Sequence, residues 1–329
     1  MRTVPLSPDG QAILLLCSTL ALPRESALKP LTPKEWSSLA ASIHGSELGT
    51  PSSLLGLEAS DIAGSLGVSP ETAVRLAELL GRGGQLAIEL DRLSTRGIWI
   101  ITRADEGYPA LFRSRLKATA PPVLFGAGNP SALVERSVAV VGSRDADEAS
   151  IAFATALGRS CARNRLALVS GAARGIDSAA MLSAADAGGR AIGVVAEALE
   201  RAVRRQDLRA QLAEDELTLI AAQHPAAGFS VGGAMGRNRL IYCLAEAAVV
   251  VASGDTGGTR AGALENLKAE WVPLFVRDEP DAPGGNRELL DAGGLPITRD
   301  DISGDSLLER LRDTPTVPYQ PTLEEAAAD

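Results

Sequence analysis

Glycine and arginine recur together in five short segments of this 329-residue sequence, each with a serine or an asparagine. The segments are Gly142-Ser143-Arg144, Ser170–Asp177, Gly236–Leu240, Ser253–Arg260 and Gly284–Arg287. A glycine lets the backbone approach an anion closely, and arginine, serine and backbone amide groups can donate hydrogen bonds to it. Together the segments therefore predict a site that binds phosphate.

The residues that we expect to bind the phosphate are Gly142, Ser143, Arg144, Ser170, Gly171, Arg174, Gly175, Arg237, Asn238, Arg239, Gly257, Gly258, Thr259 and Arg260. Arg237 and Arg239 open a predicted helix, where arginine opposes the helix dipole unless an anion is bound there. A solvated polar turn is the alternative interpretation of that segment. Asp177 either belongs to the site or only caps the helix that follows the second segment.

Short apolar runs alternate with helical stretches over the part of the chain that carries these segments. The runs cover residues 138–141, 166–169, 191–195, 217–221, 248–252 and 272–276. The helical stretches include 150–163, 178–187, 237–245 and 260–269. Runs that are apolar throughout indicate strands buried on both faces of a parallel sheet. The pattern predicts an α/β fold: a Rossmann-like, doubly wound sheet, whose loops meet at the carboxyl ends of its strands.

The predicted organisation is a helical domain over residues 1–95, the Rossmann-like domain over 96–303 and a flexible tail over 304–329. In the helical domain, Thr32 and Ser69 each precede a proline and a glutamate, as N-cap residues do. Two short helices near the second of these caps form a predicted helix-hairpin, typical of SAM-like domains. The hairpin either contacts DNA or serves as a small packing module, and its glutamates favour packing.

The composition excludes several classes of protein. A net charge of −9 rules out a generally basic coat, so any contact with nucleic acid must be a local basic pocket. An aromatic fraction of 3% argues against aromatic stacking platforms. Three distant cysteines and two histidines predict no metal site, no disulfide framework and no cofactor. No apolar stretch is long enough to span a bilayer, and we expect a cytoplasmic protein that does not bind membranes.

Four of these segments resemble motifs of the DNA-processing protein A family. Val138–Arg144 and Ser170–Asp177 are similar to its two best-known motifs, Arg237–Ile241 to its Arg-Asn-Arg helix opening, and Gly285-Asn286 to its late Gly-x-Asn segment. The resemblance spans about residues 95–300. Residues 233–236 depart from the usual Asn-Phe-Pro, residues 257–265 depart from the usual Gly-Ser-Leu-x-Thr-Ala, and no terminal winged-helix domain is expected.

The resemblance implies an extended Rossmann-like fold that binds single-stranded DNA in a basic pocket, in a homodimer without enzymatic activity. It also implies delivery of the RecA recombinase to that strand in DNA uptake and recombination, as in natural transformation. The alternative is a nucleotide-binding enzyme or sensor related to LOG-type phosphoribohydrolases, in which Glu265 would act on a ribosyl bond while Arg174 held the phosphate. Glu265 is otherwise part of a solvated helix face, and a scaffold that has lost its ligand is a third possibility.

Overall fold

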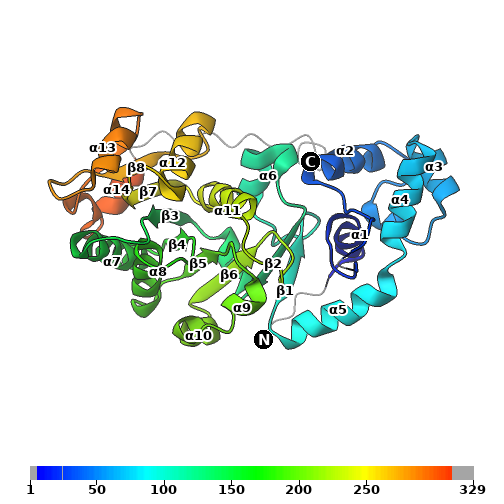
Figure 1. The fold of residues 1–329 in the computed structure, drawn as a ribbon, viewed down its shortest axis with the longest axis horizontal. Coiled ribbons are helices and arrows are strands. Elements are labelled where there is room, and N and C mark those ends of the chain that lie inside the picture. The colour runs from blue at the N-terminus through cyan, green and yellow to red at the C-terminus, as the bar shows by residue number, and fades with distance from the viewer. Residues whose placement is uncertain (1–5, 24, 313–329) are drawn as a thin grey trace. The chain divides into compact units, whose positions relative to one another are not determined.

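The computed structural model describes residues 6–23 and 25–312 (Figure 1). The chain divides into two compact units. The first comprises Met1–Tyr108, Leu116–Gly126 and Ala222–Pro225, and the second comprises Pro109–Arg115, Ala127–Ala221 and Ala226–Asp329. The first unit thus continues past residue 95 and includes the first strand of the chain.

Helices dominate the first unit. They are α1 (Pro8–Cys17), α2 (Pro33–His44), η1 (Pro51–Leu54), α3 (Ala59–Leu66), α4 (Pro70–Leu80), α5 (Gly83–Thr95) and η2 (Lys117–Thr119). Both predicted caps are confirmed: Thr32 forms a capping box with Glu35, and the Ser69 side chain accepts a hydrogen bond from the Thr72 amide. The first helix is buried, since residues 12–16 are at most 1% exposed. The unit also holds an antiparallel pair of strands, β1 (Trp99–Thr102) and β2 (Val123–Ala127).

The second unit is built on a parallel sheet. Its strands are β3 (Ser137–Gly142), β4 (Ala167–Ser170), β5 (Ala191–Val194), β6 (Leu217–Ala221), β7 (Ala247–Ala252), β8 (Leu274–Arg277) and β9 (Leu295–Ile297). They lie in the order β6-β5-β4-β3-β7-β8-β9. The residues of β4 to β8 are buried, which is why these runs are apolar throughout. The predicted doubly wound α/β fold is confirmed.

Helices cover the two faces of this sheet, with α7 and α8 on one face and α11 and α12 on the other (Figure 1). The helices of the unit are α6 (Ala110–Leu116), η3 (Pro130–Val134), α7 (Glu148–Arg163), α8 (Ile176–Asp186), α9 (Leu199–Ala202), η4 (Gln206–Leu208), α10 (Arg209–Ala213), α11 (Val231–Leu244), α12 (Gly258–Ala269), α13 (Gly284–Asp291), η5 (Asp300–Ile302) and α14 (Ser306–Arg312). Among the described residues, no helix combines the length and apolar character that crossing a membrane requires.

Two predicted boundaries differ from the structure. The helix expected to open at Gly236 begins at Val231, with Ser230 as its N-cap. Arg237 therefore lies in the second turn, and the argument from the helix dipole does not apply to it. The predicted tail begins with α14, which buries Leu307 and Leu311, while residues 313–329 lie outside the described part of the chain.

The strand order places a crevice beside β3. The chain runs from β3 outward through β4 and β5 to β6, and then returns to β7 on the other side of β3. Doubly wound sheets bind ligands at such a reversal of strand order, outside the carboxyl ends of the two strands concerned. The segments that follow β3 and β7 are two of the glycine-rich segments singled out above.

Candidate phosphate-binding site

A cavity of about 450 Å³ lies at this reversal point. Its volume is within the range of about 300–1,000 Å³ that is typical of small-molecule sites. The lining comes from the end of β3, from the loops after β3, β4 and β7, from α8, α11 and the start of α12, and from the segment before α11. The lining residues are Val141–Asp145, Ala173, Asp177, Phe229, Ala234, Arg237, Asn238, Ile241, Tyr242, Gly254 and Thr256–Thr259.

Arg237 is the buried cation of the cavity. Its side chain is 11% exposed, and its Nη1 lies 4.0 Å from Oδ2 of Asp177. Its Nε is buried and has no hydrogen-bond partner among the described residues. The guanidinium lies against Gly171, where a Cβ atom would be 1.7 Å from Nη1. Glycine at position 171 therefore makes the room that Arg237 occupies.

Burial dominates the electrostatics of Asp177, whose residue is 5% exposed. Burial raises the pKa of its carboxyl group to about 6, although the positive charge of Arg237 acts in the opposite direction. Burial likewise lowers the pKa of Arg237, because it penalises the charged form of the guanidinium. The charge of Arg237 is therefore incompletely compensated by Asp177, and an anion bound beside Arg237 would complete its compensation.

The loop after β3 forms one wall of the cavity. Gly142 packs against Ile176, since a Cβ atom at position 142 would lie 2.5 Å from that side chain. The carbonyl of Gly142 accepts a hydrogen bond from the Thr259 hydroxyl at 3.0 Å, which joins this wall to the start of α12. Arg144 lines the cavity and is exposed to solvent. An anion in the cavity can therefore meet a second, accessible cation.

The N-terminus of α12 forms the facing wall. Gly257 has φ +109°, a conformation that favours glycine, and it precedes the first helical residue, Gly258. Asn238 donates a hydrogen bond from Nδ2 to the carbonyl of Gly258 at 3.1 Å. The first amide groups of a helix have no partner within the helix, and they carry its positive dipole end. Here they border the same cavity as Arg144 and Arg237.

Three predicted arginines lie outside the lining and are paired with acids. Arg174 contacts Asp145 at 3.1 Å, Arg239 contacts Glu265 at 2.6 Å and Arg260 contacts Glu288 at 2.9 Å. Gly171 and Gly175 belong to the loop that supports the cavity, and the buried hydroxyl of Ser170 donates to the Val140 carbonyl. The predicted residues that do line the cavity are Gly142, Ser143, Arg144, Arg237, Asn238, Gly257, Gly258 and Thr259.

Glu265, the residue considered for hydrolysis, does not line the cavity. The Oε1 atom of Glu265 accepts a hydrogen bond from Arg239, so the side chain is paired rather than simply solvated on the helix surface. Asp177 is not the N-cap of α8, a position that Gly175 holds. Phe229 and Tyr242 line the cavity but escaped the sequence reasoning, because an isolated aromatic residue outside a motif carries no signal of its position.

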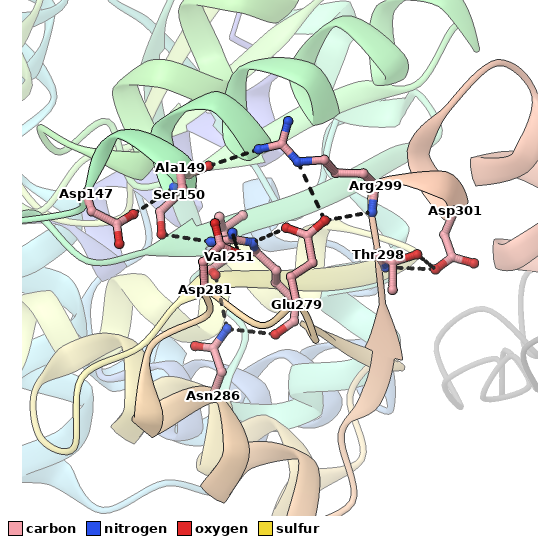
Figure 2. Close-up of polar contacts among 11 residues, drawn as sticks. Asp147, Ala149, Ser150, Val251, Glu279, Asp281, Asn286, Thr298, Arg299 and Asp301 are labelled. Carbon is pink, nitrogen blue, oxygen red and sulfur yellow. Dashed lines mark hydrogen bonds and ion pairs between the residues drawn. The ribbon is translucent and has the colours of Figure 1, made fainter.

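A buried hydrogen-bond network holds the β7 loop from behind (Figure 2). Asn286 is 1% exposed, and its Oδ1 accepts from the Ser253 amide at 2.8 Å. Its Nδ2 donates to the carbonyls of Val251 at 3.1 Å and Arg277 at 2.9 Å. Gly285 packs on the same loop, since a Cβ atom there would lie 2.4 Å from the Ser253 carbonyl oxygen. The first turn of α13 therefore fixes where the loop leaves β7.

Arg277 extends this network to the β3 side. Its side chain is fully buried and donates from Nε to Glu279 at 2.7 Å, from Nη1 to Ser150 at 3.0 Å and from Nη2 to Asp281 at 2.5 Å. Ser150 lies in the first turn of α7, directly after the β3 loop. Asn286 and Arg277 thus join the β7 loop to the start of α7, which follows the β3 loop, and Figure 2 shows polar contacts of this network.

The family model of DNA recombination-mediator protein A matches residues 99–298, which is more than half of the chain. The DNA processing protein DprA of Mycobacterium tuberculosis is 32% identical over 245 residues, covering 66% of this chain and 59% of that protein. The Bacillus subtilis DNA processing protein DprA is 27% identical over 213 residues, covering 61% of this chain and 69% of that protein. This chain therefore spans less than two thirds of the length of the mycobacterial relative.

Two solved structures share the fold at 21% sequence identity. DNA processing protein A of Streptococcus pneumoniae aligns with a TM-score of 0.66, covering 94% of this chain and 98% of that chain. DNA processing protein A of Helicobacter pylori, whose structure is described for its mode of binding single-stranded DNA, aligns with a TM-score of 0.54 and covers 65% of this chain and 96% of that chain. The motifs, the fold and the match over residues 99–298 agree, and the chain belongs to the DNA recombination-mediator protein A family.

Proposed function

We propose that this chain binds single-stranded DNA by taking a backbone phosphate of the strand into the cavity between the β3 and β7 loops. The phosphate lies between the N-terminus of α12 and the side chains of Arg144 and Arg237. Gly142, Ser143, Asn238 and Thr259 complete the site, while Arg174, Arg239 and Arg260 meet neighbouring phosphates outside the cavity.

The observation that carries this proposal is the buried, incompletely paired guanidinium of Arg237. A buried hydrogen-bond donor without a partner is costly, so native proteins rarely retain one without a reason. Its nearest acid, Asp177, lies 4.0 Å away, beyond a hydrogen bond. A phosphate oxygen is an acceptor that such a donor can bind strongly. Because the net charge of the chain is −9, the attraction for DNA must come from a local group of cations such as this one.

A single strand fits the cavity better than a duplex does. The lining surrounds its ligand with side chains from several loops, so the sugar and base attached to the phosphate must be free to turn. Bases in a duplex are held by pairing and stacking, whereas those of a single strand are not. The described binding of single-stranded DNA by the Helicobacter pylori relative supports the same preference.

The family's description as a recombination mediator supports a role beside a recombinase. We include in the proposal that the chain acts in the cytoplasm as a homodimer, without catalysing a reaction, and delivers RecA to the bound strand during DNA uptake or recombination. Assembly of RecA on labelled oligo-dT, measured by fluorescence anisotropy with and without this protein, tests that part. An assembly rate that the protein leaves unchanged would remove RecA from the proposal.

Binding itself is tested with oligo-dT and duplex DNA of equal length. We expect tighter binding of oligo-dT, and we expect Arg144→Gln to weaken it about tenfold, as the loss of a charge-assisted hydrogen bond does. The slope of log affinity against log salt should become shallower by about 0.7, the value for one phosphate contact to a single strand. Arg163→Gln is the matched control, since Arg163 is exposed at the far end of α7. Equal weakening by both substitutions, or tighter binding of the duplex, would contradict the proposal.

A further inference from the structure

We propose that residues 232–236, at the start of α11, form a gate that unwinds to admit a strand to the cavity and then re-forms. This inference rests on the proposed function, because the gate controls the entry of the strand whose phosphate the cavity binds. The gate borders the cavity, since Phe229 before it, Ala234 within it and Arg237 after it all line the cavity. A phosphate inside a strand is attached to the chain on both sides, so its entry requires a wall that can move aside.

The two ends of α11 differ in how firmly they are held. Residues 240–244, at its end, are at most 6% exposed and anchor the helix in the core. In the gate, Met235 is 51% exposed. The N-cap holds this end, because the Ser230 hydroxyl oxygen accepts a hydrogen bond from the Gly233 amide at 3.0 Å. Segments that bury little apolar surface open more readily than the rest of a fold, so the start of α11 can unwind while its end stays in place.

Glycine weakens the helix at the gate, although space does not require it there. A Cβ atom at Gly142 or Gly171 would lie 2.5 Å or less from a neighbouring side chain, so packing requires those two glycines. At Gly232 and Gly236 a Cβ atom would meet no other part of the structure within 4 Å, and neither residue has a positive φ. Alanine would fit both positions and would favour the helix. What glycine contributes here is therefore a helix that unwinds easily.

A gate of this kind sets the rates of binding rather than the affinity. Only the unwound form admits a strand, so the association rate is proportional to the fraction of molecules whose gate is open. Ala234 lines the cavity when the gate is helical, so the gate closes over the bound strand and must open again before the strand leaves. The same opening limits association and dissociation, and its cost cancels in Kd.

The test replaces Gly232 and Gly236 by alanine and follows oligo-dT binding by stopped-flow fluorescence anisotropy. Each substitution should slow association and dissociation about fivefold, which corresponds to the preference of about 1 kcal/mol for alanine over glycine in a helix. The double variant should slow both about 25-fold and leave Kd unchanged. Gly64→Ala is the matched control, because Gly64 lies within α3 and a Cβ atom there would also meet nothing within 4 Å. This control should leave both rates unchanged.

Amide hydrogen exchange of the protein without DNA tests the gate independently of the proposed function. The amides of residues 234–238 should exchange faster than those of residues 240–244, and the double substitution should slow the exchange of the first group about 25-fold. A wild type that does not bind oligo-dT would overturn the proposed function, whereas the exchange rates decide whether the gate opens. Equal protection of the two groups, or rates of binding that the double variant leaves unchanged or raises, would refute the gate.

Discussion

Replacement of Asp177 by asparagine should stabilise the protein at neutral pH, although it removes the acid nearest to Arg237. Burial raises the pKa of Asp177 from 3.8 to about 6 in the folded state. Because the folded pKa lies above the unfolded one, the carboxyl group stabilises the fold when protonated, and this contribution is lost as the pH rises from about 4 through 6. The difference between the two pKa values corresponds to about 3 kcal/mol at pH 7. An asparagine never ionises and avoids this cost.

The competing effect is the loss of a partner for a buried cation, which costs about 3–5 kcal/mol in a close, fully buried pair. Here the pair is separated by 4.0 Å, and burial outweighs the attraction of Arg237 in setting the pKa of Asp177. We therefore expect Asp177→Asn to raise the melting temperature at pH 7 by about 6–12 °C, from about 2–4 °C per kcal/mol for a domain of this size. The gain should vanish near pH 4. A lower melting temperature of the variant at pH 7 would show that pairing outweighs burial.

Asp177 should also make DNA binding depend on pH. Asp177 lies 4.0 Å from Arg237, so its carboxylate would oppose a phosphate bound to that guanidinium. Two unit charges about 8 Å apart repel each other by about 2 kcal/mol at an effective dielectric constant near 20, which is about 30-fold in affinity. Affinity for oligo-dT should fall by up to that factor as the pH rises from about 5 to 8, and Asp177→Asn should abolish the dependence. Fluorescence anisotropy at constant ionic strength measures both. A wild type whose affinity does not change with pH would place the phosphate away from Arg237.

Two further substitutions test the supports of the site. Gly171→Ala would place a Cβ atom 1.7 Å from Arg237 Nη1, so oligo-dT affinity should fall at least about tenfold in titrations; a change below about threefold would mean that the position of Arg237 does not matter. Asn286→Asp cannot donate its two hydrogen bonds and should lower both the unfolding free energy, by about 1–3 kcal/mol, and the oligo-dT affinity. Asn266→Asp is the control, because Asn266 makes a similar buried pair of hydrogen bonds to the backbone of Val272, beyond the end of α12. This substitution should lower the unfolding free energy without changing the oligo-dT affinity. If Asn286→Asp and Asn266→Asp weaken oligo-dT binding equally, Asn286 has no positioning role.

The central sheet could be predicted because strands buried on both faces are apolar throughout, and such runs can be recognised in the sequence. Residues 217–221 were expected as a strand and form β6 with the same bounds. Elements without such an apolar run were not predicted. β9 has only three residues, one of them Pro296, and α5 begins at Gly83 without a side-chain cap. Such segments take their structure from tertiary packing rather than from local preference.

The start of α11 illustrates the same limit. Gly232, Gly233 and Gly236 all lie within its first two turns, where glycine costs about 1 kcal/mol relative to alanine. Local preference therefore placed the start of the helix near residue 236, several residues too late. The argument from the helix dipole was therefore wrong for Arg237. This residue does line the cavity, but from the second turn of the helix rather than from its first.

Glycine positions in the sequence indicate where the candidate site lies, whereas the orientation of its outer arginines depends on acids that are distant in sequence. Arg174, Arg239 and Arg260 pair with acids 29, 26 and 28 residues away, and no local pattern reports such pairs. These pairs are at least partly exposed, so each contributes about 0–1 kcal/mol and can be exchanged for a phosphate at little cost. Arg237 differs from these three arginines, because its side chain is buried in the cavity wall and has no exposed pair to exchange for a phosphate. In the proposed complex a strand therefore meets one buried cation in the cavity wall, and we expect the outer arginines to strengthen binding only where a phosphate displaces their acids.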